Sequence, residues 1–208
     1  MPISGSIVEL DRLTDAISVT AEKGYCHVPG GLEPVWRQQL RNCAALDWRI
    51  LPEKVGEVRQ TASAAILHRE FPAPVALFAD AVRRAVSDGV GAEFEANEAT
   101  FMRYVGRPSG ISPHRDHRDF RVIVAIASLL GQAIMCIHGS RSPDDVIDRF
   151  RVSPGDLVFL RGVGLVDSLD PLSARPIHSV SAPVNGTRVS LSLRMAPNSP
   201  DGRRPIQG

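Results

Sequence analysis

Cysteine is scarce in this chain of 208 residues, and its three copies form no pattern. Cys26, Cys43 and Cys136 are odd in number and widely spaced, and there is no CxxC motif. A disulfide framework needs paired cysteines, and zinc sites need closely spaced ligands. We therefore expect reduced thiols and a cytoplasmic protein.

Long apolar runs and an excess of one charge are also missing. The N-terminal residues show no basic segment followed by an apolar stretch, and no run approaches the roughly 20 apolar residues of a membrane-spanning helix. Lys and Arg number 24 against 23 Asp and Glu, so the net charge is +1. This balance produces no overall field for polyanions, and the few aromatic residues, 5% of the chain, do not cluster with basic ones. We expect no membrane association, and nucleic acid is the less favoured partner.

What is present fits one globular domain over 1–208, with 43% hydrophobic and 23% charged residues. Three segments of the first half have helical spacing. Ser6 and Glu9 form a capping-box pattern before a helix over about 7–22, Pro34 opens a second helix, and 74–89 forms a third that Gly89 ends. We predict that 1–96 is a helical support that also borders the substrate entrance.

From about residue 97 the apolar pattern changes to a period of two. Short β-branched or apolar runs such as RVIVAIASLL, DLVFLRG and TRVSLSLRM are separated by turn residues. Many short strands behind a helical layer predict an α+β, mainly β fold, a sandwich or jelly roll in 97–196. The polar segment 197–208 is predicted to be a flexible tail.

The stretch ISPHRDHRDF, 111–120, has the densest chemistry of the chain. At a strand end, His114 and Asp116 point the same way and could hold one ion together. An HxD motif alone is weak, and a charged, solvated turn is the better explanation of it when it stands alone. His178 lies in the strand-like run RPIHSV. With His114 and Asp116 it would complete a set of two histidines and one carboxylate, which suits non-haem Fe(II). The alternative is that His178 is a histidine of the apolar core without a metal.

The run RVSLSLRM alternates strictly between polar and apolar residues. One face carries Arg188, Ser190, Ser192 and Arg194, and the other carries only apolar side chains. A half-exposed strand with its polar face in water is the ordinary interpretation. Turned inward, the same face would hold a dicarboxylate through guanidinium and hydroxyl groups.

Together these residues resemble a known pattern. His114 and Asp116, His178, and Arg188 ten residues later within Arg-Val-Ser are similar to the HxD...H...RxS motif of the Fe(II)/2-oxoglutarate-dependent dioxygenases. Within that superfamily the chain most resembles the AlkB-like group, whose last strand has two arginines six apart, as Arg188 and Arg194 are. The resemblance covers about 97–196.

The resemblance implies a double-stranded β-helix, with Fe(II) held by His114, Asp116 and His178 as catalytic metal ligands. It further implies that Arg188, assisted by Ser190 or Tyr104, binds the far carboxylate of 2-oxoglutarate, and that Arg194 lies near the chelating end. O2 would be the third reactant.

Two positions depart from the AlkB-like motif. Met102 replaces an asparagine that contacts the cosubstrate, and Arg118 replaces an acidic residue that reads the damaged base. Because Asp116 supplies a carboxylate, the resemblance implies hydroxylation or another hydrogen-abstraction outcome rather than halogenation.

The resemblance leaves three hypotheses for function. The first is an oxygenase that hydroxylates a small organic substrate, or otherwise oxidises it by C–H abstraction, and decarboxylates 2-oxoglutarate to succinate. An anionic substrate would suit Arg115 and Arg118. The second is an AlkB-like demethylase of alkylated nucleic-acid bases, which salt-sensitive binding to single-stranded DNA would reveal. The third is a ligand-binding jelly roll without activity, which the complete ligand set disfavours.

Overall fold

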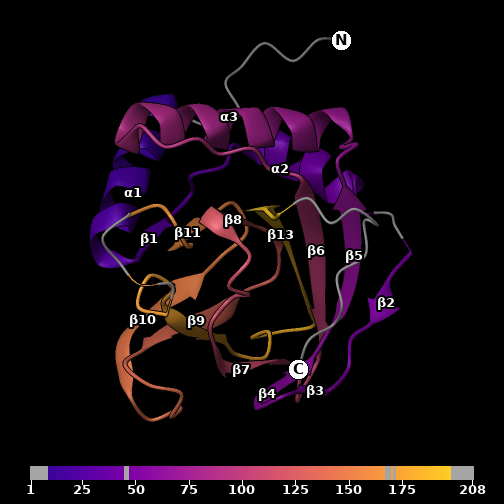
Figure 1. The fold of residues 1–208 in the computed structure, drawn as a ribbon. Coiled ribbons are helices and arrows are strands. Elements are labelled where there is room, and N and C mark those ends of the chain that lie inside the picture. Colours follow the sequence, from indigo (N-terminus) through magenta and orange to yellow (C-terminus); the bar gives the residue numbers. More distant parts are fainter. Residues whose placement is uncertain (1–8, 45–46, 167–169, 171, 198–208) are drawn as a thin grey trace.

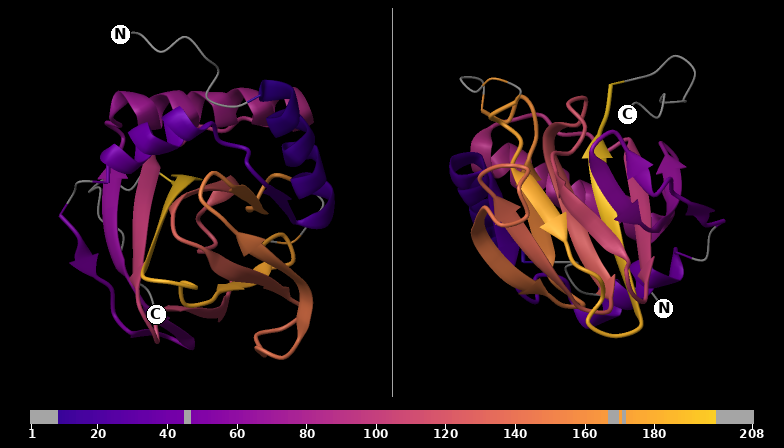
Figure 2. Two further views of the ribbon diagram at one scale, coloured as in Figure 1. Left: turned by 180° about the vertical axis from the view of Figure 1, so that it is seen from behind. Right: turned by 90° about the horizontal axis from the view of Figure 1, so that it is seen from below.

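The computed structural model describes residues 9–44, 47–166, 170 and 172–197 (Figure 1). Two antiparallel sheets face each other, and three helices lie together on the outer side of the larger one (Figures 1 and 2). The helices are α1 (Leu10–Lys23), α2 (Pro34–Asn42) and α3 (Ala73–Val90). Within the described residues, none of the helices has the length and apolar content to cross a membrane.

The larger sheet has seven strands, and the smaller has six. In spatial order the larger contains β1 (Tyr25–Val28), β11 (Leu157–Arg161), β8 (Arg121–Leu130), β13 (Thr187–Met195), β6 (Glu98–Val105), β5 (Ser63–His68) and β2 (Arg49–Ile50). The smaller contains β10 (Val146–Val152), β9 (Ala133–His138), β12 (Ile177–Val180), β7 (Gly110–His114), β4 (Val58–Thr61) and β3 (Lys54–Val55). The predicted mainly β jelly roll with supporting helices is confirmed.

Two apolar clusters hold these layers together. The first joins the helices to the outer face of the larger sheet and includes the fully buried Phe78, Phe101 and Leu191. The second lies between the sheets around Val124, Ile137, Val158 and Leu160. Side chains alternate between the two faces of each strand, so β8 contributes to both clusters.

The first half differs from the expected helical segment because it also supplies β1 to β5, which extend both sheets. These strands have two to six residues, too few to show a clear period of two. The first helix begins at Leu10, and Ser6 of the expected capping box lies outside the described residues.

The prediction that Gly89 ends the third helix was wrong. Helix α3 continues through Val90 and is capped by Gly91, whose φ of 66° is left-handed. Gly89 instead allows close packing, because a Cβ there would lie 2.9 Å from the carbonyl oxygen of Thr14 in α1. A glycine near a helix end can either cap the helix or allow another helix to pack closely, and only the tertiary structure shows which of the two applies.

Candidate metal and cosubstrate site

The two histidines of the predicted ligand set come from neighbouring strands of the smaller sheet. His114, the last residue of β7, is the register partner of His178 in β12, so both rings project from the same face. Their centroids are 4.3 Å apart. Asp116 follows two residues after His114, and one ligand atom of each of the three residues lies within 4.8 Å of the others.

Backbone carbonyls orient both imidazoles. Nδ1 of His114 lies 2.9 Å from the carbonyl oxygen of Ser112, and Nδ1 of His178 lies 3.3 Å from that of Pro176. When Nδ1–H donates to the carbonyl, Nε2 keeps its lone pair for a metal. Burial, reinforced by the neighbouring His178, lowers the pKa of His114 to about 4. The ring is therefore neutral near pH 7, the form that binds a metal.

Asp116 provides the fit test for a cation. Burial favours the neutral acid, but His178, Arg194 and His114 favour the anion and hold the pKa of Asp116 below its usual value. Its Oδ2 atom is buried and has no hydrogen-bond partner among the described residues. A buried anionic oxygen without a donor is costly, and a metal ion held beside the two imidazole rings would satisfy it. The three residues therefore fit a metal with two nitrogen ligands and one oxygen ligand.

The polar face of β13 is turned inward. Arg188, Ser190 and Ser192 are each at most 4% exposed, although the opposite face of the strand is also buried. The interpretation of this strand as half exposed to water is thus wrong, because the smaller sheet and its loops enclose the face that a lone strand would show to solvent.

Arg188 is the cation at one end of this face. Burial lowers the pKa of its guanidinium, and its Nε atom has no hydrogen-bond partner in the part of the chain that the structure describes. The guanidinium carbon lies 5.6 Å from the ring centroid of Tyr104, the register partner on β6. Ser190 follows on the same face. A buried guanidinium beside two hydroxyl-bearing side chains is suited to bind a carboxylate.

The same architecture occurs in solved structures, although no family model and no curated protein matches the chain. A Pseudomonas putida prolyl-4-hydroxylase is similar at a TM-score of 0.62 and 18% identity, over 90% of this chain and 100% of that one. OsALKBH1 is similar at a TM-score of 0.63 and 12% identity, over 83% of this chain and 98% of that one. The alpha ketoglutarate dependent carbocyclase SnoK from nogalamycin biosynthesis is similar at a TM-score of 0.60 and 14% identity, over 95% of this chain and 92% of that one. The chain has the fold of the 2OG-Fe(II) oxygenases.

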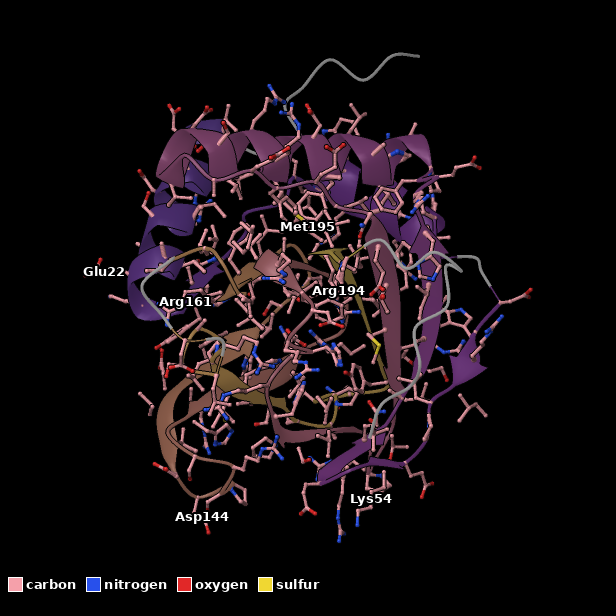
Figure 3. The ribbon with its side chains drawn as sticks, in the orientation of Figure 1. Glu22, Lys54, Asp144, Arg161, Arg194 and Met195 are labelled. Atoms are coloured by element: carbon pink, nitrogen blue, oxygen red, sulfur yellow. The ribbon has the colours of Figure 1, made fainter. Side chains whose placement is uncertain are left out.

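Within this 2OG-Fe(II) oxygenase fold, Arg194 has a partner that the sequence did not reveal. Its Nη1 atom donates to Oε1 of Glu98 and to Oγ1 of Thr100, both at 3.0 Å. Figure 3 shows Arg194 between the two sheets, whereas Met195, the next residue, lies toward α3. The register pairs Arg194 with Glu98, and strand pairing between distant segments cannot be read from composition or period.

A second missed residue is Arg175, in the loop before β12. Its Nη1 atom donates to the backbone carbonyl of Asp116 at 2.6 Å, and Nε of Arg115 donates to the carbonyl of Arg175 at 3.1 Å. Arg161 holds the same loop by donating to the carbonyls of Ala174 and of Ala21 in α1, both at 2.8 Å. The length of the connection after β11 was the signal that this loop borders the site.

The residues after Asp116 form a local turn. The amide of Phe120 donates to the carbonyl of His117, and Nδ1 of His117 lies 3.3 Å from a carboxylate oxygen of Asp119. Arg118 is exposed at this turn, and Arg115 is half-buried. That Arg115 or Arg118 contacts a substrate stays a prediction.

Proposed function

We propose that the protein is an Fe(II)/2-oxoglutarate-dependent oxygenase that hydroxylates a small organic substrate. In the overall reaction, substrate C–H, O2 and 2-oxoglutarate give the alcohol, succinate and CO2. The observation that carries the proposal is the convergence of His114, Asp116 and His178, in which a buried carboxylate oxygen of Asp116 has no donor among the described residues. The resemblance in motif and the likeness in fold support the same conclusion.

In this proposal His114, Asp116 and His178 hold the iron on one side, which leaves open positions for 2-oxoglutarate and O2. Iron bound there would supply the oxidising chemistry that removes a hydrogen atom from a substrate C–H bond. Arg188 binds the far carboxylate of 2-oxoglutarate, with Ser190 and Tyr104 beside it, and Arg194 lies toward the chelating end.

The chain itself contributes orientation and the exclusion of water. Arg188 is 4% exposed, so a carboxylate paired with it exchanges its hydration shell for fixed donors. The carbonyl of Ser112 fixes the ring of His114, and Arg175 restrains the backbone of Asp116, which keeps the ligands in place before a metal arrives. The cytoplasm is the proposed compartment, because Cys26, Cys43 and Cys136 are unpaired.

The rim favours an anionic substrate. Besides burial, the neighbouring Arg115, and further Arg118 and Arg141, lower the pKa of the Arg175 guanidinium, which indicates that these cations gather near the ligand-bearing segment. A carboxylate or phosphate on the substrate would reduce their mutual repulsion. A screen of carboxylic acids and amino acids beside their uncharged amides, scored by succinate release above the substrate-free rate, tests this. Turnover of the uncharged compounds alone would contradict it.

A nucleic-acid demethylase is the second candidate, favoured by the likeness to OsALKBH1 and the spacing of Arg188 and Arg194. Because phosphate contacts release counterions, such an enzyme would bind single-stranded DNA with an affinity that falls steeply with salt. Fluorescence anisotropy with a methylated oligonucleotide at two salt concentrations distinguishes the two candidates.

The first test of the proposed function is an anaerobic titration of metal-free protein with Fe(II) and 2-oxoglutarate. We expect the visible charge-transfer band of the chelate in the parent protein and its loss in His114→Ala. His117→Ala is the matched control, because its ring contacts Asp119 rather than the ligand cluster, and should keep the band. A folded parent protein without a band would contradict the proposal.

A further inference from the structure

The ion pair of Glu98 and Arg194 is more enclosed than an ordinary surface pair. The side chains are 6% and 16% exposed, and Nη1 of Arg194 lies 3.0 Å from Oε1 of Glu98. Thr100, two residues along β6, has its hydroxyl 3.0 Å from the same nitrogen. Two fixed contacts on one nitrogen hold the guanidinium in one orientation.

The held guanidinium lies against the segment that bears two of the predicted iron ligands. Its central carbon is 4.6 Å from the ring centroid of Phe120, which ends the turn that begins after Asp116. Phe120 lies four residues after Asp116, so the cation of Arg194 lies close to the ligand-bearing segment. The charge of Glu98 therefore also acts near the chelating end of the site.

Arg188, at the other end of the polar face, has no such pairing. It forms no ion pair with any carboxylate that the structure describes, although it is as buried as Glu98. The polar face thus carries two arginines. Arg194 is neutralised by Glu98, whereas the positive charge of Arg188 is not balanced by a described carboxylate and can bind an anionic ligand.

We propose that Glu98 is a positioning residue of the 2-oxoglutarate site, which fixes Arg194 beside the ligand segment and cancels its charge. Arg188 is then the one unpaired cation of the polar face, and it selects the far carboxylate of the cosubstrate. This assignment rests on the proposed function and adds to it a residue outside the resembled motif.

The substitution Glu98→Gln removes the negative charge of residue 98 while keeping a hydrogen-bond acceptor that can hold Arg194 in place. The amide oxygen of glutamine still accepts a hydrogen bond from Arg194, but the negative charge is gone. A buried cation without its counter-charge destabilises the fold, and it also raises the positive potential where a keto acid binds. Stability and anion affinity should therefore change in opposite directions, which loss of packing alone would not produce.

The experiment measures two quantities for each variant: the Tm of the metal-free protein, and the anaerobic Kd of the Fe(II) protein for a keto acid, from the charge-transfer band. The keto acids are 2-oxoglutarate and 2-oxopentanoate, which has the same length but lacks the far carboxylate. For Glu98→Gln we expect a Tm lower by several degrees and binding of both compounds about fivefold tighter.

Three variants complete the test. In Glu98→Gln/Arg194→Met the unpaired positive charge is removed as well, so both keto acids should bind more weakly than they bind to Glu98→Gln. Arg188→Met should weaken the binding of 2-oxoglutarate by about 100-fold and leave that of 2-oxopentanoate unchanged, because 2-oxopentanoate has no far carboxylate for Arg188 to bind. Glu95→Gln, the same change at an exposed position nearby, is the matched control and should change neither quantity.

The outcomes separate the two proposals. If the parent binds keto acids but Glu98→Gln binds them equally or more weakly at a lower Tm, the pair is only structural and the assignment of Glu98 is wrong. If the parent forms no chelate, the proposed function fails, and the role of Glu98 at a cosubstrate site fails with it.

Discussion

The two faces of β13 are buried to the same degree and are chemically opposite. On β13, Leu191 and Leu193 face the helices and are 0% exposed, whereas Ser190 and Ser192 face the smaller sheet and are 3% and 4% exposed. The outer face buries apolar area, which stabilises the fold. The inner face of β13 buries polar atoms, and the Nε atoms of Arg188 and Arg194 have no hydrogen-bond partner among the described residues, which costs stability. Such a cost is typical of a functional site.

Removing an inner carboxylate should produce the largest effect on binding. We expect Asp116→Ala to weaken Fe(II) binding by more than about 100-fold, because it deletes a predicted ligand. The Tm of the metal-free protein should fall by only a few degrees, because the lost anion balances neighbouring cations but also has a buried oxygen without a donor among the described residues. Calorimetric titration with Fe(II) and thermal unfolding measure the two quantities. Asp119→Ala, at the exposed turn, is the control, and equal affinities in both variants would contradict the ligand assignment.

Leu191→Ala on the outer face should have the converse effect. Deleting a fully buried leucine should lower the free energy of unfolding by about 2–5 kcal/mol and leave the Fe(II) affinity unchanged. Ser192→Ala, the adjacent residue on the inner face, should cost less than about 1 kcal/mol. Urea unfolding measures both, and a larger loss for the serine variant would reverse the assigned roles of the faces.

Arg175→Met examines how the loop supports the inner face. Its guanidinium donates to the backbone of Asp116, so we expect Fe(II) to bind about tenfold more weakly at unchanged stoichiometry. Arg149→Met, an exposed arginine on β10, is the matched control. Equal Fe(II) affinities for the two variants would mean that the loop does not position the ligand.

The smallest effect is expected at the edge where β1 approaches β10. The hydroxyl of Tyr25 donates to Oδ2 of Asp148 at 2.7 Å, and burial together with this carboxylate raises the pKa of Tyr25 to about 12. A raised pKa favours the neutral phenol, so the stabilisation is complete below the unfolded value near 10 and is lost between about pH 10 and 12. Tyr25→Phe should lower the Tm by about 2 °C at pH 8 and by less at pH 11, and an equal or larger difference at pH 11 would exclude this role.

The sequence predicted much of this architecture where a pattern is long and regular. The run RVIVAIASLL coincides with β8, and TRVSLSLRM coincides with β13, because nine or ten residues show their period clearly. The strands of the first half escaped prediction because they are short, and Gly89 was misread because its use depends on Thr14 of another helix.

By itself, the sequence determined which residues could form a metal and carboxylate site. The residue types and spacing of His114, Asp116, His178 and Arg188 indicate which metal and which anion could bind, because ligand type is a property of each side chain. Only the tertiary structure decided that the polar face of β13 is enclosed, that Glu98 pairs with Arg194, and that Arg175 restrains Asp116. These contacts join segments about 60 to 100 residues apart, and strand register, which no local period records, brings them together.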